Sequence, residues 1–324
     1  MVHAVRVHEL GGPQVLTYEA VAVPPPGPGE VQIRQTAIGL NFIDVYFRTG
    51  VYKAASLPFI PGSEGAGVVE AVGPGVDGFH QGDRVAYAMS IGAYAEVRNV
   101  PASLLVHVPA AIDDRTAAAM MLKGMTAQYL VRQVHHVKPG DVILIQAVAG
   151  GVGLLLAQWA HALGATVIGT VGSKDKAELA LANGADHVIL YRDEDFVHKV
   201  KEITGGKLCD VVYDGVGQAT YPGSLACLRP LGLWVSFGNA SGVIKNFDLL
   251  ALSQHGSLFA TRPTLGTFTA RRESLLAMAN DLFEAVLTGA LKIPVHQTYA
   301  LKDAAKAHHD LEARTTTGST LLLP

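Results

Sequence analysis

Three glycines stand between two strongly apolar runs near the middle of the chain. They are Gly150, Gly151 and Gly153, in the segment 147–153 with the sequence AVAGGVG. Glycines at such a turn let the backbone approach a pyrophosphate, whose charge is stabilised by the N-terminal end of the following helix. Val148 departs from a strict G-x-G-x-x-G motif, and a tight turn packed against a neighbouring helix is the alternative interpretation. Because strand and helix patterns flank the turn, we expect a dinucleotide site.

The end of the next expected strand bears on the choice of dinucleotide. An NAD site usually offers an acidic residue about 20 positions after the first glycine, to bind the ribose 2′-hydroxyl. Here the strand runs into Gly172 and Ser173, followed by Lys174, Asp175 and Lys176. Small residues leave room for a 2′-phosphate, a serine hydroxyl donates to it, and lysines neutralise it. Asp175 argues the other way, although acids are common at helix N-termini, and solvated lysines at a helix start are the alternative. We expect NADP(H) rather than NAD(H).

From residue 141 onward, apolar runs alternate with helical patterns of about ten residues. Such alternation predicts βαβ units, and therefore a parallel sheet covered on both faces. The expected strands are 142–147, 166–171, 188–190, 209–214 and 233–237, and the expected helices are 153–163, 175–182, 195–204 and 218–228.

The first 120 residues have a different pattern, with short strands and frequent turn signals, which indicates antiparallel β structure. The expected strands there are 31–38, 67–72, 84–87 and 94–97. Helices are expected at 113–122, 126–134, 271–288 and 302–314, with a last strand at 320–323.

Composition excludes several classes of protein. The chain has 324 residues, of which 49% are hydrophobic and 16% charged, with a net charge of −3. Disorder is excluded by the apolar content, and nothing in the charge favours a nucleic acid or an acidic membrane as partner. Cys209 and Cys227 are too few for a disulfide framework or a four-cysteine zinc site. No apolar signal-peptide region is present near the first residue, so we expect a cytoplasmic protein.

One stretch complicates this interpretation. Residues 142–173 contain no Asp, Glu, Lys or Arg, and this length is sufficient for a membrane span. Glycines near the middle, together with Gln146 and Gln158, favour a buried strand, a turn and a buried helix instead.

Several motifs together resemble one enzyme family over essentially the full chain. They are residues 11–13 (GGP), 37–44 (AIGLNFID), 61–67 (PGSEGAG), 147–153 (AVAGGVG) and 235–239 (VSFGN). The chain resembles the zinc-free, zeta-crystallin-like NADPH:quinone oxidoreductases of the medium-chain dehydrogenase/reductase superfamily.

The resemblance implies an α/β fold with two parts: a GroES-like, β-rich catalytic domain and a Rossmann domain with a doubly wound parallel sheet. The expected division is 1–124 for the first part of the catalytic domain, 125–262 for the NADP-binding domain and 263–324 for the segment that completes the catalytic domain. The resemblance also implies cofactor contacts from Asn41, Thr126, Gly150, Gly151, Val152, Gly172, Ser173, Lys176, Tyr191, Val216, Phe237, Asn239, Arg262 and Arg314. Tyr191 and Arg314 rest on the resemblance alone, because the sequence by itself makes both ordinary surface residues.

Metal binding is not expected. Zinc-dependent relatives have a metal-binding cysteine where this chain has Asn41, and a histidine where it has Ser63. The pairs 135–136 and 308–309 are His-His, but adjacent helical residues point in different directions, so we expect these histidines at the surface. Without a Lewis acid to polarise an alcohol, the favoured substrate is an electron-poor acceptor such as a quinone.

Three residues are the candidates for catalysis: Asn41, Tyr46 and Tyr52. The tyrosines are expected to line the substrate pocket, and packing of a loop against the barrel is their alternative role. Either a nearby hydroxyl such as theirs or water could protonate the reduced oxygen. Asn41 could hold the nicotinamide ribose or a substrate oxygen, while Asp44 could serve only to orient that loop.

Two other classes of function remain open. An NADPH-dependent enone or alkenal double-bond reductase would share every cofactor residue and differ only in its pocket. Some relatives act as crystallins or bind RNA, although the near-neutral charge opposes RNA as the main partner. The resemblance also implies a homodimer, expected through sheet edges near residues 233–246.

Overall fold

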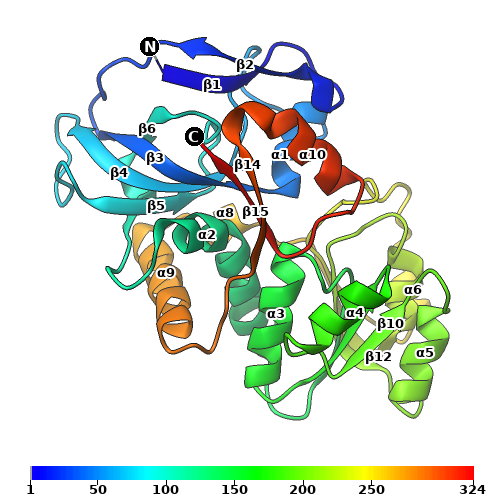
Figure 1. Cartoon of the computed structure of the whole chain (residues 1–324). Helices are drawn as coiled ribbons and strands as arrows, with labels where there is room; N and C mark the ends of the chain where they lie inside the picture. Colours follow the sequence, from blue (N-terminus) through cyan, green and yellow to red (C-terminus); the bar gives the residue numbers. More distant parts are fainter. Residues whose placement is uncertain (1) are drawn as a thin grey trace. The chain divides into compact units, whose positions relative to one another are not determined.

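In a computed structural model, which describes residues 2–324, the chain divides into two compact units (Figure 1). The first unit contains the chain up to Met125, together with Thr269–Leu287 and Ile293–Pro324. The second contains Thr126–Phe268 and Thr288–Lys292. The first unit differs from the expected catalytic domain in three places: it includes Met125, and it lacks residues 263–268 and 288–292.

The first unit is built around a seven-stranded sheet with the order β14-β15-β3-β4-β5-β7, in which β6 pairs with β3. All of these pairs are antiparallel except β14 with β15. The strands are β3 (Glu30–Leu40), β4 (Glu64–Val72), β5 (Arg84–Ala88), β6 (Val97–Pro101), β7 (Val106–His107), β14 (Val295–Ala300) and β15 (Ser319–Leu323). A separate antiparallel pair is formed by β1 (Val2–Val7) and β2 (Leu16–Val21).

The strand expected at 94–97 is misplaced, because the structure has β6 at Val97–Pro101. The reason lies in the backbone at Tyr94, whose carbonyl accepts a hydrogen bond from the Val5 N–H at 2.8 Å and so contacts β1 instead of the main sheet.

Four longer helices belong wholly or partly to this unit: α1 (Phe42–Thr49), α2 (Asp114–Tyr129), α9 (Arg272–Leu287) and α10 (Ala304–Glu312). The helical segments expected at 113–122 and 126–134 form one continuous run, in which α2 is followed by a π-helical turn at Leu130–Val134. Gly124 lies within α2, where its role is packing. A Cβ there would lie 2.6 Å from Leu282 of α9, so the glycine permits close approach of the two helices.

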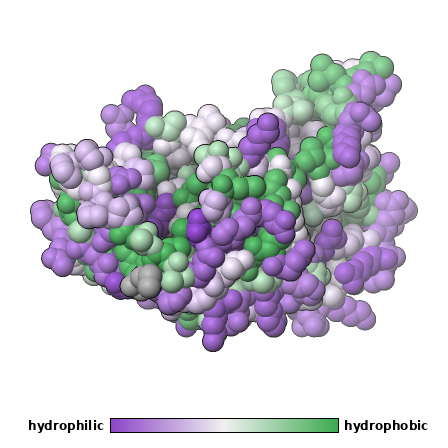
Figure 2. Space-filling view, turned by 90° about the horizontal axis from the view of Figure 1, so that it is seen from above, coloured by the Kyte–Doolittle hydropathy of each residue, from purple (hydrophilic) through white to green (hydrophobic). Residues whose placement is uncertain are grey.

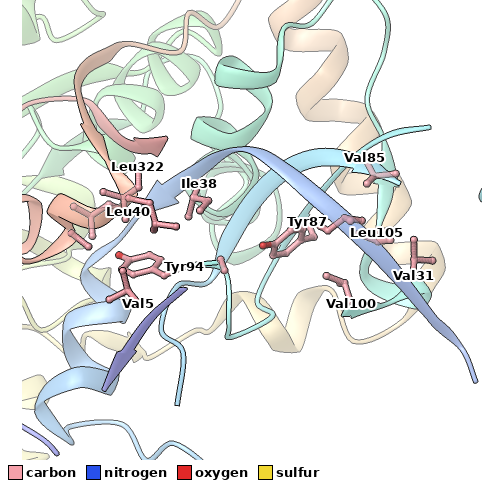
Figure 3. Close-up of a cluster of buried hydrophobic side chains, with 14 of the residues drawn as sticks. Val5, Val31, Ile38, Leu40, Val85, Tyr87, Tyr94, Val100, Leu105 and Leu322 are labelled. Carbon is pink, nitrogen blue, oxygen red and sulfur yellow. The ribbon is translucent and has the colours of Figure 1, made fainter. Parts of the chain in front are cut away.

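The core of the first unit lies between its strands and α10. Figure 3 shows part of it, with Val5, Ile38, Leu40, Tyr94 and Leu322 pointing toward one another from different strands and loops. All five are buried, so burial of apolar area stabilises this arrangement. The same figure labels a second group further along the sheet: Val31, Val85, Tyr87, Val100 and Leu105.

The second unit contains a six-stranded parallel sheet with the order β10-β9-β8-β11-β12-β13. Its strands are β8 (Val142–Ile145), β9 (Thr166–Val171), β10 (His187–Leu190), β11 (Cys209–Asp214), β12 (Leu228–Ser236) and β13 (Phe259–Thr261). Its helices are α3 (Gly151–Ala162), α4 (Lys174–Leu181), α5 (Phe196–Ile203), α6 (Tyr221–Ala226), α7 (Leu250–Gln254) and α8 (Leu265–Phe268) (Figure 1). The strand order reverses between β8 and β11, as in a doubly wound nucleotide-binding fold. The predicted fold class is confirmed.

The charge-free stretch 142–173 is explained by this sheet. It contains β8, α3 and β9, and the residues of both strands are almost all buried. Strands covered on both faces have continuous apolar sequences, which accounts for the missing charges. Within residues 2–324, no helix combines the length and apolarity that a membrane crossing requires.

The expectation of a sheet edge near residues 233–246 is wrong. β12 lies inside the sheet, because it pairs with β11 on one side and with β13 on the other. The edge strand on this side of the sheet is β13, whose Phe259 is 61% exposed. Other exposed apolar side chains of this unit include Leu231, Val243, Leu249 and Leu250. Figure 2 shows, on one face of the molecule, how hydrophobic side chains reach the surface in groups among hydrophilic ones.

Candidate cofactor and substrate site

The predicted cofactor residues of the second unit share one position in the fold, because nearly all of them follow the carboxyl end of a strand. Parallel strands end at the same edge of a sheet, so these residues gather there. The residues are Gly150, Gly151 and Val152 after β8, Gly172, Ser173 and Lys176 after β9, Tyr191 after β10, Val216 after β11, Phe237 and Asn239 after β12, and Arg262 after β13. The switch between β8 and β11 lies in the middle of this edge.

The glycine turn has the geometry of a phosphate site. A Cβ on Gly153 would lie 2.5 Å from the carbonyl oxygen of Val148 and 2.7 Å from that of Ala147, so only glycine permits this turn. No side chain of the described residues caps the N-terminus of α3 at Gly150. The first amides of α3 therefore point outward without a capping partner, and an anion can bind them.

A buried polar network holds this turn in place. Gln146 Oε1 accepts a hydrogen bond from Thr170 Oγ1 at 2.7 Å, and the same hydroxyl oxygen accepts one from the Ala147 N–H at 3.1 Å. Gln146 Nε2 donates to Ser224 Oγ, whose hydroxyl donates to Asp214 Oδ2 at 2.8 Å. Sequence reasoning missed these residues. Their signal was a polar residue at the end of an otherwise apolar strand.

Asp214 also shapes the loop that contains Val216. Its Oδ1 accepts hydrogen bonds from the Val216 N–H at 2.9 Å and the Gly217 N–H at 3.0 Å. The carbonyl of Val216 then accepts the Ser241 N–H at 2.8 Å. This bond joins the loop after β11 to the loop after β12, and so places Val216 near the segment with Phe237 and Asn239.

The end of β9 lies beside the end of β10. The Tyr191 N–H donates to the Val171 carbonyl at 3.1 Å, and a Cβ on Gly172 would lie 2.8 Å from the Tyr191 hydroxyl. Ser173 is the N-cap residue of α4, but its side chain forms no capping hydrogen bond. Gly172, Ser173 and Tyr191, each an expected cofactor contact, are thus neighbours, and Lys176 follows in the first turns of α4.

Asn41 lies in the first unit, at the N-terminus of α1, and its amide is held in one orientation. Its Nδ2 donates to Glu64 Oε1 at 2.8 Å and to the Gly39 carbonyl at 3.3 Å. Lys123 Nζ also donates to Glu64 Oε1 at 2.6 Å, and the Leu122 N–H donates to Oε2 at 2.7 Å. Since both partners of Nδ2 are acceptors, the amide oxygen is the accepting atom; it faces the Asp44 N–H in the capping box of α1, and its second lone pair is left for a ligand. Glu64 and Lys123 were not predicted.

Asp44 is fully buried behind Asn41. Its carboxylate accepts hydrogen bonds from the Asn41 N–H at 3.0 Å, from Ser63 Oγ at 2.7 Å and from the Tyr94 hydroxyl at 3.0 Å. Burial raises the pKa of Asp44 to about 7, against the effect of these donors, and the negative charge of Glu64 adds to the rise. The expectation that Asp44 orients this loop agrees with its capping of α1.

His308 corrects an expectation, because it is fully buried, whereas its neighbour His309 is exposed. The Tyr94 hydroxyl lies 2.9 Å from His308 Nε2, and Arg48 Nη1 lies 2.9 Å from Nδ1. Because arginine only donates, Nδ1 is the acceptor and Nε2 donates to Tyr94. Burial, together with the Arg48 charge, lowers the pKa of His308 to about 3, so the ring is neutral. The prediction erred because α10 turns this residue toward the core.

Tyr46 and Tyr52 are packed together. Their ring centroids lie 5.2 Å apart in an edge-to-face arrangement, and Phe42 and Phe47 contact the same pair. Tyr46 is buried and Tyr52 is half-buried. Packing therefore accounts for the rings, while their hydroxyls stay candidates for chemistry.

The remaining predicted residues are dispersed. Thr126 is buried in α2, at the first position of the second unit, while Arg262 is exposed after β13. Arg314 is exposed in the first unit just after α10, with a positive φ of 59°. In the part of the chain from residue 2 onward, no group of three His, Cys, Asp or Glu residues is arranged to hold a metal ion.

Asp44 leads to a prediction for pH. Its pKa of about 7 in the folded protein exceeds the ordinary aspartate value, so the unfolded chain releases this proton first as the pH rises. Its contribution to stability is full below about pH 4 and is lost toward pH 7, at no more than about 1.4 kcal/mol per pH unit. The advantage of the wild type over Asp44→Asn should therefore shrink between pH 5 and pH 7 in urea unfolding. If the stability advantage of the wild type grows over this interval, the pKa of Asp44 is not raised in the folded protein.

Comparison with known proteins identifies the family. Residues 27–110 match the alcohol dehydrogenase GroES-like domain, and residues 151–282 match the zinc-binding dehydrogenase domain. A quinone oxidoreductase of Pseudomonas aeruginosa is 52% identical over 325 residues, covering 100% of both chains. The chain belongs to the quinone oxidoreductase family of the medium-chain dehydrogenase/reductase superfamily. The resemblance inferred from the motifs is confirmed.

Two further members of this superfamily bear on function. The crystal structure of Escherichia coli quinone oxidoreductase complexed with NADPH has a TM-score of 0.98 and 48% identity, and it covers 99% of this chain and 100% of that one. A 2-haloacrylate reductase of a Burkholderia species is 47% identical over 331 residues, covering 100% of this chain and 99% of that protein.

Proposed function

We propose that the protein is an NADPH-dependent quinone oxidoreductase. The observation that carries this proposal is the row of predicted cofactor residues at the strand ends of the second unit, in a fold that matches a quinone oxidoreductase complexed with NADPH. Bound NADPH supplies a hydride, which together with one proton reduces a quinone to its hydroquinone.

The glycine turn fits the pyrophosphate of this cofactor. Gly153 lets the turn close, and the uncapped amides of α3 offer donors to phosphate oxygens. Because Gln146 and Thr170 fix the turn from behind, the donors are positioned before the cofactor arrives. Preorganised donors lose little entropy on binding, which favours affinity.

The orientation of Asn41 favours one of its two expected roles. With Nδ2 held by Glu64 and Gly39, the side chain offers its oxygen, which accepts a hydrogen bond. A quinone oxygen is also an acceptor, so the two cannot pair directly. A ribose hydroxyl can donate to Asn41, and we assign this side chain to the nicotinamide ribose.

Tyr46 and Tyr52 are the proposed proton donors. Replacing either by phenylalanine keeps the ring packing and removes only the hydroxyl. If one of them protonates the substrate, its variant should lower kcat with quinone on the order of a hundredfold, with KM for NADPH unchanged. Steady-state rates decide this, and wild-type kcat in both variants would limit the tyrosines to packing.

A second function has a specific observation in its favour. The relative described as a 2-haloacrylate reductase acts on an electron-poor carbon–carbon double bond, and its identity to this chain is nearly as high. Reduction of a short enone or alkenal is therefore the alternative activity at the same site. NADPH consumption measured with a quinone and with a short enone separates the two. A higher kcat/KM for the enone would favour the alternative.

We also propose a cytoplasmic homodimer formed through β13. Within residues 2–324, no further strand pairs with the outer side of this edge strand, and Phe259, Leu249 and Leu250 are exposed apolar side chains in the same part of the chain. An exposed apolar edge favours pairing with a second copy. Light scattering on the purified protein measures the mass directly, and a monomer at micromolar concentration would contradict the dimer.

A further inference from the structure

The ends of β9 and β10 bring a second cation-bearing segment to the expected 2′-phosphate site. Leu190 of β10 pairs with Val171 of β9, so the residue pairs that follow each strand lie side by side. After β9 come Gly172 and Ser173, and after β10 come Tyr191 and Arg192. Arg192 is not among the residues that the motifs or the family resemblance pointed to.

Arg192 lies directly over the turn. A Cβ built on Gly172 would be 3.4 Å from Arg192 Nε and 2.8 Å from the Tyr191 hydroxyl. The missing side chain at Gly172 is therefore what lets the guanidinium and the hydroxyl approach the same backbone segment. Ser173 adds a hydroxyl that does not cap its own helix. Three donors of different types converge here.

The guanidinium of Arg192 is exposed and is not neutralised within the protein. Among residues 2–324 it forms no hydrogen bond and no ion pair. Of the three acids that follow it, Asp193 is exposed and forms no ion pair with Arg192 among the described residues, and the other two are engaged elsewhere. Glu194 accepts the Leu190 N–H at 2.9 Å and lies 3.7 Å from Lys199 Nζ, while Asp195 caps α5 through the Val197 N–H.

We propose that Arg192 binds the 2′-phosphate of the cofactor and thereby selects NADPH over NADH, together with Ser173, Lys176 and Tyr191. The planar guanidinium presents paired donors that match two phosphate oxygens, whereas NADH offers only a hydroxyl at this position. This inference rests on the proposed NADPH dependence and adds the residue that enforces it.

The test uses fragments of the cofactor, so that binding is measured without turnover. Adenosine 2′,5′-bisphosphate contains the 2′-phosphate, and 5′-AMP lacks it. Calorimetric titration of the full-length protein gives Kd for each. Arg192→Gln removes the charge, Arg192→Lys keeps it without the paired donors, and Lys207→Gln is the control. Lys207 is an exposed cation near the opposite, amino end of β11.

We expect Arg192→Gln to weaken binding of adenosine 2′,5′-bisphosphate about tenfold, with Kd for 5′-AMP unchanged. Arg192→Lys should lie between this variant and the wild type, and Lys207→Gln should bind both fragments like the wild type. If Arg192→Gln binds the bisphosphate normally, or loses affinity for both fragments equally, Arg192 does not bind the 2′-phosphate. A wild type that does not prefer the bisphosphate would instead overturn the NADPH dependence itself, and this inference with it.

Discussion

Replacing Gly153 by alanine will remove most of the affinity for NADPH while leaving the fold of the second unit intact. The added Cβ would lie 2.5 Å from the Val148 carbonyl oxygen and 2.7 Å from that of Ala147. Both are backbone atoms, so the turn must open rather than a side chain move aside. Opening displaces the first amides of α3 from the pyrophosphate. We expect a loss of about 2–3 kcal/mol in binding, on the order of a hundredfold in Kd.

The measurement is NADPH fluorescence titration, with far-UV circular dichroism as the check of folding. Gly27→Ala is the matched control, because a Cβ there would lie 3.3 Å from the flexible end of the Glu30 side chain in the other unit. That variant should bind NADPH normally. Wild-type affinity in Gly153→Ala would mean that the cofactor does not use this turn.

The second large effect concerns the buried ion pair behind Asn41. Lys123 Nζ lies 2.6 Å from Glu64 Oε1, and the two side chains are 6% and 0% exposed. Lys123→Met keeps the length of the side chain but leaves a buried carboxylate without its cation. Because an uncompensated buried charge is costly, we expect a loss of about 3–5 kcal/mol in the free energy of unfolding.

Urea unfolding followed by far-UV circular dichroism measures this loss in the free energy of unfolding. Lys302→Met removes an exposed lysine of the same unit and should change stability by less than about 0.5 kcal/mol. Combining Lys123→Met with Glu64→Gln removes both charges, and this double variant should be more stable than Lys123→Met alone. A double variant that is less stable would show that the buried charge is not the cause.

Much of the second unit could be predicted from the sequence because its signals are local. β9 and β11 lie at the predicted residues 166–171 and 209–214, since buried parallel strands have continuous apolar runs with glycine or polar residues at their ends. The glycine turn was visible for the same reason. Asp214 and Gln146 were missed, because a polar residue at a strand end becomes informative only when the strand order places it next to its partners.

The first unit was predicted less completely, because its important contacts join distant parts of the chain. Asn41 was identified, but Glu64 is 23 residues away from it and Lys123 lies 59 residues further on. His308 contacts Arg48 across 260 residues, and no local pattern could reveal that α10 would bury it. Such pairs depend on tertiary packing, whereas the spacing of residues within one element does not.

A comparison of the two nicotinamide cofactors tests whether this chain uses NADPH to reduce a quinone. With a soluble benzoquinone as acceptor, initial rates at varied NADPH and NADH give kcat/KM for each. We expect NADPH to be favoured by on the order of a hundredfold, since the 2′-phosphate gains charge-assisted hydrogen bonds. Equal values for the two cofactors, or no quinone-dependent oxidation of NADPH, would contradict the account.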